Sequence, residues 1–284
     1  MGSFSVLNNI AGTNAQNQLN TNSVSLARTL GRLASGRRIN SGADDAAGLQ
    51  IADSLRANVR ALDQAVRNAN DGISVAQIAD GALAEISNLL TRAVTLAEES
   101  ATETVDSTGR ASLNAEFTQI EAEIARIATQ TNFNGVGLFT TTGVNGSLSV
   151  FVGDISGASS ISVTISSISV TGSTVTGIGG QDLTTVDLTT TGGAASALTV
   201  IKNGLSAVSN MRADTGAGIN RLQSAVAVLQ TQSQNTLAAE STIRDANMAE
   251  EVASLTKFQI LSQSGIAALT QANSNSQNVL SLLR

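Results

Sequence analysis

Apolar side chains recur with a mean spacing of 3.5 residues from Leu55 to Ala97, and the pattern never loses phase. This spacing places the apolar side chains on one face of a helix and is typical of coiled-coil packing. Gly72 and Gly81 each cost about 1 kcal/mol of helix stability, yet the pattern continues across both. We therefore expect one uninterrupted helical rod over residues 44–100, roughly 80 Å long at about 1.5 Å per residue.

Two further segments carry the same pattern. Apolar residues from Leu113 to Ile127 follow gaps of four and three, shortly after the turn-forming sequence DSTG at 106–109. A short connection makes successive helices antiparallel neighbours, so we expect this helix to fold back along the first rod. The spacing from Leu198 to Leu229 predicts a third rod that shares the same seam.

The two ends of the sequence carry narrower apolar stripes. Residues 1–43 contain no Asp or Glu, and their only charges belong to four arginines. A narrow stripe does not hold an isolated helix in water, because helices gain most of their stability from packing. We expect these segments to pack first on each other and then on other copies of the chain, which indicates an assembly protein. The stripe residues are Leu19, Leu26, Leu30 and Leu33 near the amino end and Met248, Val252, Leu255, Phe258 and Leu261 near the carboxyl end.

Three glycines at six-residue intervals, Gly36, Gly42 and Gly48, separate the first stripe from the long rod. Glycine tolerates backbone conformations that other residues avoid, so this segment predicts a joint between two domains. The returning chain is expected to cross the joint near residues 241–247. Residues 1–43 and 243–284 then form a terminal coiled-coil domain, and residues 44–242 form the rod domain.

Two adjacent acids follow the joint. Asp44 and Asp45 stand where the long rod is expected to begin, and Ser41 precedes them. Because adjacent helical residues point about 100° apart, the pair does not converge on one metal ion. Acids in a first turn favour the helix dipole, and we expect Ser41 to cap the helix.

The middle of the sequence shows the pattern of β-strands and turns instead of helical spacing. Asn134-Gly135 and Asn145-Gly146 are turn signals, and apolar residues alternate over 148–152 and 161–165. A one-residue slip in the alternation after Ile165 predicts a bulge or a short turn. Residues 171–194 are rich in Gly and Thr, and we expect a surface loop there. The fold class is therefore mainly α, with long helical hairpin rods and a small β-rich tip at about 140–193.

Composition excludes several classes of function. The net charge is −6, so no basic surface is available for nucleic acid or for an anionic membrane. The absence of His and Cys removes the commonest general base, the thiol nucleophile and the usual transition-metal ligands, and we expect no cofactor. No run of 18 apolar residues exists, so no membrane insertion is expected. No secretory signal is visible, and that rule alone predicts the cytoplasm.

An enzyme housed in the β region is the alternative from another class. Such a site needs a nucleophile with a base, or a cage of metal ligands. The acids between 143 and 193 are Asp154, Asp182 and Asp187, and they lie in loop-like sequence. We therefore expect a structural protein and no catalytic residue.

Four separated motifs resemble bacterial flagellin, in the same order along the sequence. They are LASGRRINSGADDAAGLQIA at 33–52, RNANDGIS at 67–74, TQTNFNGVGLF at 129–139 and SNSQNVLSLLR at 274–284. The resemblance covers residues 1–142 and about 195–284. The short segment 143–193 lies where flagellins vary, so the large outer domains of longer flagellins look absent.

The resemblance implies a structural subunit that polymerises into the flagellar filament used for motility. It also implies export of the unfolded chain by the flagellar type III apparatus and folding on assembly outside the cell, which replaces the cytoplasmic prediction. The implied partners are other copies of the chain, the flagellar cap, hook-associated proteins and an export chaperone. A hook–filament junction protein, which shares similar termini, is the alternative within the same class.

A receptor contact is also implied by resemblance alone. Arg92, Leu96 and Glu116 fall where some flagellins are recognised by Toll-like receptor 5 (TLR5). The sequence LTRAVTL at 90–96 matches that pattern at Leu90, Arg92 and Leu96, and departs from it at the three residues between Arg92 and Leu96. The other interpretation is that Arg92 and Glu116 are rod-surface groups that contact neighbouring subunits.

Overall fold

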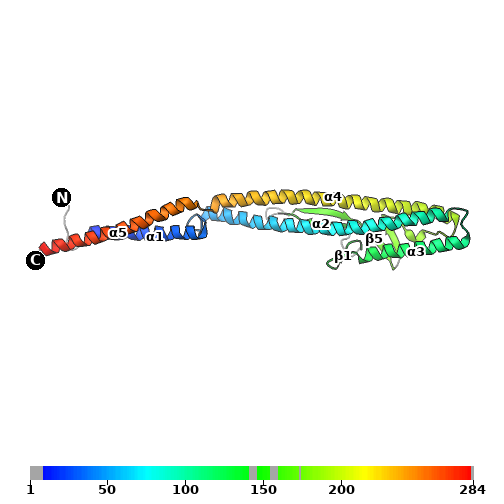
Figure 1. The fold of residues 1–284 in the computed structure, drawn as a ribbon, viewed down its shortest axis with the longest axis horizontal. Coiled ribbons are helices and arrows are strands. Elements are labelled where there is room, and N and C mark those ends of the chain that lie inside the picture. Colours follow the sequence, from blue (N-terminus) through cyan, green and yellow to red (C-terminus); the bar gives the residue numbers. More distant parts are fainter. Residues whose placement is uncertain (1–8, 141–145, 154–158, 173, 283–284) are drawn as a thin grey trace. The chain divides into compact units, whose positions relative to one another are not determined.

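The computed structural model describes residues 9–140, 146–153, 159–172 and 174–282. The protein divides into two compact units (Figure 1). Residues 1–57 and 235–284 form the terminal unit, and residues 58–234 form the central unit. Helices α2 (Ala46–Ser100) and α4 (Thr191–Arg244) contribute to both units. None of the described helices is long and apolar enough to cross a membrane.

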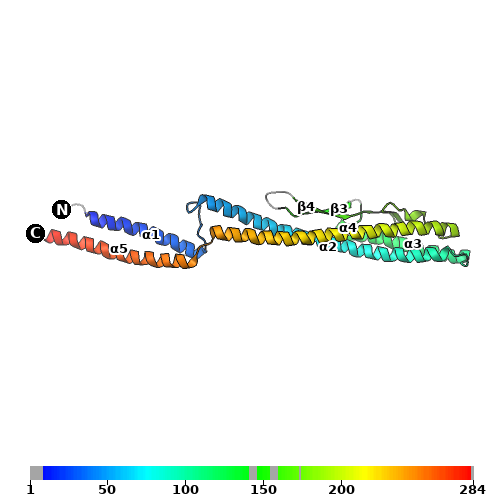
Figure 2. The same cartoon turned by 90° about the horizontal axis from the view of Figure 1, so that it is seen from above.

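The terminal unit is built on the pairing of α1 (Ile10–Ser35) with α5 (Met248–Leu282), which lie side by side in both views (Figures 1 and 2). Small residues allow the two helices to approach closely. A methyl group on Gly265 would lie 3.3 Å from Leu19 Cδ1. Asn9 caps α1, because its Oδ1 accepts a hydrogen bond of 2.9 Å from the Gly12 N–H.

The central unit confirms the three predicted rods. α2 begins two residues later than expected and ends at Ser100, and α3 (Ser107–Gln130) follows after a short turn. Their buried faces, together with that of α4, form one hydrophobic core. The predicted spacing appears in this core directly: the buried side chains include Leu62, Leu83, Ile86 and Leu90 of α2, Phe117 and Ile124 of α3, and Ile201, Val208 and Leu222 of α4.

Three antiparallel hairpins complete the described part of the central unit. β1 (Asn132–Phe133) pairs with β2 (Val136–Gly137), β3 (Gly146–Phe151) with β4 (Ser160–Ile165), and β5 (Ile168–Thr171) with β6 (Thr174–Ile178). The slip that follows Ile165 separates β4 from β5, and the β5–β6 ladder carries an irregularity at Ser169/Val170. The predicted turn or bulge is confirmed.

The β3–β4 hairpin lies against the sides of the rods, although the strands were expected at their tip. A methyl group on Gly72 of α2 would lie 2.5 Å from Val150 Cγ2, and one on Gly218 of α4 would lie 2.6 Å from Val163 Cγ1. Glycine therefore opens a gap in each helix surface that a valine of the hairpin fills. The sequence pattern could not show this, because it records the helix phase and not which side chain approaches a glycine.

The prediction of a surface loop at 171–194 is wrong. This segment contains β6 and the short 3₁₀ helix η1 (Leu183–Thr185). Its apolar residues Val175, Ile178, Leu183 and Leu188 are buried in the central core. They are spaced too irregularly to give a periodic signal, and α3 and other members of the central core supply the surface that covers them.

Candidate assembly site

The terminal unit has a thin core. Among the described residues, its buried hydrophobic side chains are Ile39 and Ala52, whereas the central unit holds all the others. The same unit carries most of the large hydrophobic side chains that remain exposed. Because burial of apolar surface is the main source of stability, the terminal helices are the weakly stabilised part of the protein.

The predicted amino-terminal stripe is covered unevenly. Leu19, Leu26 and Leu33 are half-buried. Leu30 is 46% exposed, although its spacing from Leu26 and Leu33 places it on the same face of α1. The face is therefore only partly covered within one subunit.

The carboxyl-terminal stripe is also covered unevenly. Leu255 and Phe258 are half-buried. Met248, Val252 and Leu261 are 47%, 49% and 38% exposed. Gaps of four and three identify apolar side chains of a helix but do not tell which of two adjacent faces a partner covers.

Four exposed apolar residues were not singled out from the sequence. Ile10 and Val24 of α1 are 65% and 60% exposed, and Ile260 and Ile266 of α5 are 57% and 52% exposed. Ile10, Val24 and Ile260 lie out of phase with the predicted stripe of their helix, whereas Ile266 keeps its phase but lies beyond the last residue of the stripe. We define the assembly surface as the exposed apolar side chains of the two helices: Ile10, Val24, Leu30, Met248, Val252, Ile260, Leu261 and Ile266.

The joint is held by the backbone of both passing segments. Arg37 forms an isolated antiparallel bridge with Asp245. The Arg38 N–H donates to the Arg244 carbonyl at 2.7 Å, and the Ala246 N–H donates to the Gly36 carbonyl at 3.0 Å. The returning chain meets the first segment at residues 244–246, within the expected 241–247. Both segments belong to the terminal unit, and a joint between two domains here stays a prediction.

The three glycines of the joint have different surroundings. Gly36 ends α1 in the left-handed region, with φ of 69°, where a side chain would be strained. Gly48 lies inside the first turns of α2, where a methyl group would meet Asp45 Oδ2 and Ile39 Cδ1 at 2.4 and 2.8 Å. Nothing lies within 4 Å of the position that a methyl group on Gly42 would take. Steric need is therefore plain at Gly36 and Gly48.

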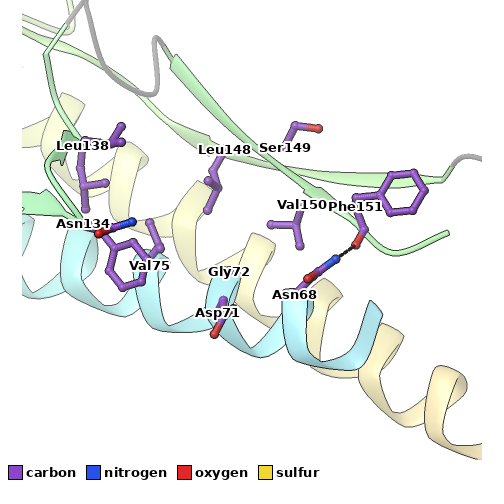
Figure 3. Close-up of a pocket in the computed structure, with 12 residues that line it drawn as sticks. Asn68, Asp71, Gly72, Val75, Asn134, Leu138, Leu148, Ser149, Val150 and Phe151 are labelled. Carbon is purple, nitrogen blue, oxygen red and sulfur yellow. Dashed lines mark hydrogen bonds between the residues drawn. The ribbon is translucent and has the colours of Figure 1, made fainter. Parts of the chain in front are cut away.

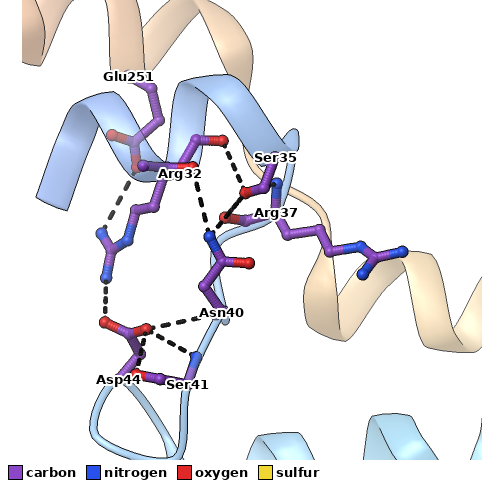
Figure 4. Close-up of polar contacts among 8 residues, drawn as sticks. Arg32, Ser35, Arg37, Asn40, Ser41, Asp44 and Glu251 are labelled. Atoms are coloured by element: carbon purple, nitrogen blue, oxygen red, sulfur yellow. Dashed lines mark hydrogen bonds and ion pairs between the residues drawn. The ribbon is translucent and has the colours of Figure 1, made fainter.

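Arg32 is the centre of an ion-pair cluster at the joint (Figure 4). Its Nη1 lies 3.5 Å from Glu251 Oε1 in α5, and its Nη2 lies 3.6 Å from Asp44 Oδ1 in the segment before α2. Beside it, the Asn40 side chain donates to the Gly31 carbonyl at 3.3 Å and to Ser35 Oγ at 2.9 Å. One guanidinium thus links α1 both to α5 and to the segment that leads into α2.

The prediction that Ser41 caps α2 is wrong. The helix begins at Ala46, and the Gly48 N–H donates to Asp45 Oδ1 at 2.8 Å, so Asp45 is the capping side chain. The Ser41 hydroxyl instead donates to Asp44 Oδ2 at 3.1 Å. Burial opposes ionisation of Asp44, but hydrogen bonds from Ser41 and Asn40 and the charge of Arg32 together lower its pKa below the ordinary value.

A second ion-pair cluster ties α2 to α4 within the terminal unit. Arg244 Nη1 lies 2.9 Å from Asp53 Oδ1 and 3.9 Å from Glu240 Oε1. Arg56 Nε lies 3.7 Å from the same Glu240 oxygen. Arg244 and Glu240 are both buried, so this end of the helix pair is held by charge more than by apolar packing.

The three residues of the receptor resemblance do not share one surface. Arg92 and Glu116 are exposed, and their side chains form an ion pair of 2.8 Å between α2 and α3. Leu96 is fully buried in the central core. In this conformation a partner can reach Arg92 and Glu116 but not Leu96.

The acids of the β region cap local turns. Asp182 Oδ1 accepts from the Thr184 N–H at 2.9 Å, and Asp187 Oδ1 accepts from the Thr189 N–H at 2.8 Å. Hydrogen bonds from the Thr189 hydroxyl and N–H lower the pKa of Asp187. Asp154 and Asn145 lie outside the described residues. No group of acids suited to a metal ion occurs in the described part of the protein.

An apolar pocket opens in the central unit where α2 meets the β1–β2 and β3–β4 hairpins (Figure 3). Its volume is about 370 Å³, and its lining includes Asn134, Leu148 and Val150. The Asn68 side chain closes one end by donating to the Phe151 carbonyl at 3.2 Å.

Comparison with known proteins agrees with this architecture. Residues 6–143 match the bacterial flagellin N-terminal helical region, and residues 198–283 match the bacterial flagellin C-terminal helical region. The flagellin of Halalkalibacterium halodurans is 40% identical over 278 residues, which cover 97% of this chain and 98% of the relative. The flagellin of Bacillus subtilis is 36% identical over 303 residues, with the same shares of both proteins.

One further relative is named as a filament protein. The flagellar filament 31.3 kDa core protein of Treponema maltophilum is 35% identical over 284 residues, which cover 97% of this chain and 98% of the relative. The family matches therefore include both helical ends, and the relatives span nearly the whole sequence. The chain belongs to the bacterial flagellin family, whose members are structural subunits of the extracellular flagellar filament.

Proposed function

We propose that this protein polymerises into the flagellar filament through the assembly surface of α1 and α5. The observation that carries the proposal is the contrast between the two units. The central unit has an extensive core, whereas the described terminal unit buries only Ile39 and Ala52 among its hydrophobic residues. Copies of the protein would supply the burial that the terminal helices lack.

The free energy available from covering these exposed side chains is large enough to drive assembly. Burying the remaining half of a large aliphatic side chain contributes about 1 kcal/mol. Covering all side chains of the assembly surface would therefore contribute on the order of 5–10 kcal/mol per subunit. The loss of translational and rotational freedom on association offsets part of this gain. Folding of the terminal unit and polymerisation are then coupled.

A single exposed side chain gives a sharp test. Ile260→Ser removes apolar surface that touches little within one subunit, since Ile260 is 57% exposed. We expect the thermal unfolding of the monomer to stay unchanged, while the critical concentration for seeded polymerisation rises about fivefold, equivalent to about 1 kcal/mol. Lys257→Ser, an exposed position of the same helix, is the matched control. Equal critical concentrations for the two variants would count against the assembly surface.

A deletion tests the division into units. Removing residues 1–20 and 265–284 should leave the unfolding transition of the central unit intact and abolish polymerisation. Polymerisation of the shortened protein would contradict the proposal. The domain limits proposed from the sequence, 1–43 with 243–284 and 44–242, place the joint between two domains. The compact units of the structure instead meet at 57/58 and 234/235. Protease protection of the monomer, mapped along the sequence, would distinguish the two sets of limits.

Family membership supports a proposal about export and assembly partners. We propose that the protein leaves the cell unfolded through the flagellar type III apparatus, with an export chaperone, and that it assembles beneath the flagellar cap next to hook-associated proteins. The relatives named above are flagellins and a filament core protein, which favours the filament over the hook–filament junction. No catalytic role is proposed. Co-purification of the full-length protein with these flagellar components is the direct test.

Recognition by TLR5 is a narrower proposal. It would involve the exposed pair Arg92 and Glu116 and not the buried Leu96. In a receptor-reporter assay, Arg92→Ala should lower signalling by the monomer. Unchanged signalling together with shorter filaments would assign the pair to contacts between subunits.

A further inference from the structure

The dipeptide Asn-Gly occurs in two different described backbones. Asn134-Gly135 forms the two-residue loop between β1 and β2, where Phe133 pairs with Val136. Asn203-Gly204 lies inside the long helix α4. Both asparagines precede a glycine, so the same chemical groups are present at the two sites. The sites differ in the conformation of the local backbone.

We propose that Asn134 is a site of spontaneous deamidation and that Asn203 is protected. In this reaction the Gly135 backbone nitrogen bonds to Asn134 Cγ and loses its proton to water, the bond between Cγ and Nδ2 breaks, and ammonia leaves. Water then opens the resulting succinimide at either carbonyl and gives aspartate or isoaspartate. The balance is one water consumed and one ammonia released, with no oxidant or reductant.

The loop of Asn134 offers the freedom that ring closure needs. Asn134 is exposed, and its φ of 51° and the φ of 79° at Gly135 place both residues in the left-handed region. Nothing lies within 4 Å of an added Cβ at Gly135 or at Gly204, so crowding beside the glycine does not distinguish the two sites, and the backbone conformation does. Each strand of the hairpin is only two residues long, and such a small hairpin is marginal by itself and opens readily.

Asn203 is also exposed, but its backbone is helical. The residue after it, Gly204, is buried within α4, and its N–H takes part in the helical hydrogen-bond pattern. A helical backbone turns the following nitrogen away from Cγ of the asparagine. Reaction there requires several turns of a long, well-packed helix to open together.

The product would change the pocket of Figure 3. Asn134 and Asp71 both line this largely apolar pocket. A carboxylate at 134 adds a second negative charge to a lining shared with Leu138 and Val150, and an isoaspartate also adds an atom to the backbone of the hairpin. The bond from the Leu138 N–H to the Thr131 carbonyl, 3.0 Å long, continues this hairpin and should weaken.

The test is peptide mapping of the full-length protein by mass spectrometry after incubation in mildly alkaline buffer. In the folded protein we expect conversion at Asn134 to be at least about tenfold faster than at Asn203, because their local opening energies differ. In urea, where the backbone difference is gone, the two rates should be similar. Asn134→Gly, which suits the same positive φ, should keep the fold and remove the corresponding ammonia release.

Two results would overturn the proposal. Equal rates at the two positions in the folded protein would show that the backbone does not control the reaction. A folded protein in which Asn134 stays intact while the unfolded form reacts there would show that the hairpin protects it. Neither result depends on polymerisation, so the outcome is independent of the proposed function.

Discussion

The guanidinium of Arg32 lies 3.5 Å from the carboxylate of Glu251, so an ion pair joins the last turns of α1 to the first turn of α5. The same guanidinium is 3.6 Å from Asp44. Both acids are largely covered, with side-chain exposures of 14% each, so neither is screened as a free surface charge would be. In a unit with little apolar core, this charge cluster is a main constraint on the direction of the terminal helices.

Replacing Arg32 tests that role. Arg32→Met keeps much of the side-chain volume but leaves Asp44 and Glu251 without their common partner. We expect a loss of about 1 kcal/mol in the local stability of the terminal unit, near the upper end for partly exposed ion pairs. Hydrogen exchange of α1 and α5 measures it, and Arg28→Met, at an exposed position of the same helix, is the control. Equal exchange in both variants would show that the cluster does not constrain these helices.

Acid should open the joint. The pKa of Asp44 is lowered in the folded protein, so the folded state releases this proton more readily than the unfolded state. The stabilisation is therefore complete above the ordinary Asp pKa of about 4 and is lost as the pH falls through the lowered folded-state value. Protection factors near residues 40–44, which are corrected for the slower intrinsic exchange of amides in acid, should fall on acidification. In Asp44→Asn this fall should be smaller, and an identical acid response in both proteins would contradict the assignment.

A buried acid gives the central unit the opposite pH dependence. Glu121 of α3 is 6% exposed, and its Oε1 accepts from the Val175 N–H at 3.0 Å. Burial raises the pKa of Glu121, the hydrogen bond opposes that shift, and the charge of Asp182 adds to it. The folded protein therefore holds this proton more tightly, and the free energy of unfolding falls as the pH rises from about 4.3 through the raised folded-state pKa.

The variant Glu121→Gln isolates this effect, because the amide oxygen can still accept from Val175. We expect it to be more stable than the parent at neutral pH and to lose the decline with pH. Urea unfolding at about pH 5 and about pH 8 measures the difference. A parent protein that is equally stable at both values would show that Glu121 is not the titrating group.

Two glycines of α2 should respond oppositely to alanine. Gly81 is exposed with nothing within 4 Å of an added methyl group, so Gly81→Ala should stabilise the central unit by about 1 kcal/mol. At Gly72 the same methyl group would lie 2.5 Å from Val150 Cγ2, and the clash should cancel that gain or reverse it. Equal stabilisation by both substitutions would show that the β3–β4 hairpin does not pack on α2 as described.

The contrast between these glycines shows how far the sequence could predict the fold. The regular spacing from Leu55 to Ala97 predicted the start of α2 to within two residues. This worked because the apolar residues of a buried helix face recur at helical spacing in the sequence. The burial of Val175 and Leu183 gives no such spacing, because distant parts of the central core, α3 among them, cover these residues. Contacts between distant segments decide such burial, and a single segment does not encode them.

The sequence also predicted only part of the candidate assembly site. The apolar character of both terminal helices is plain in the sequence, whereas the division between half-buried Leu255 and exposed Val252 depends on where the other helix lies. The meeting of Arg32 with Glu251 was not anticipated, because the two residues belong to opposite ends of the sequence. A basic residue in the last turn of α1 and acids in the first turn of α5 were the available signals.

Hydrogen exchange of the dilute monomer beside the assembled filament tests most directly whether the terminal helices depend on neighbouring subunits. We expect amides of the central core to be protected in both samples, while those of α1 and α5 become protected only in the filament. Strong protection of α1 and α5 in the solitary monomer, equal to that in the filament, would contradict this dependence.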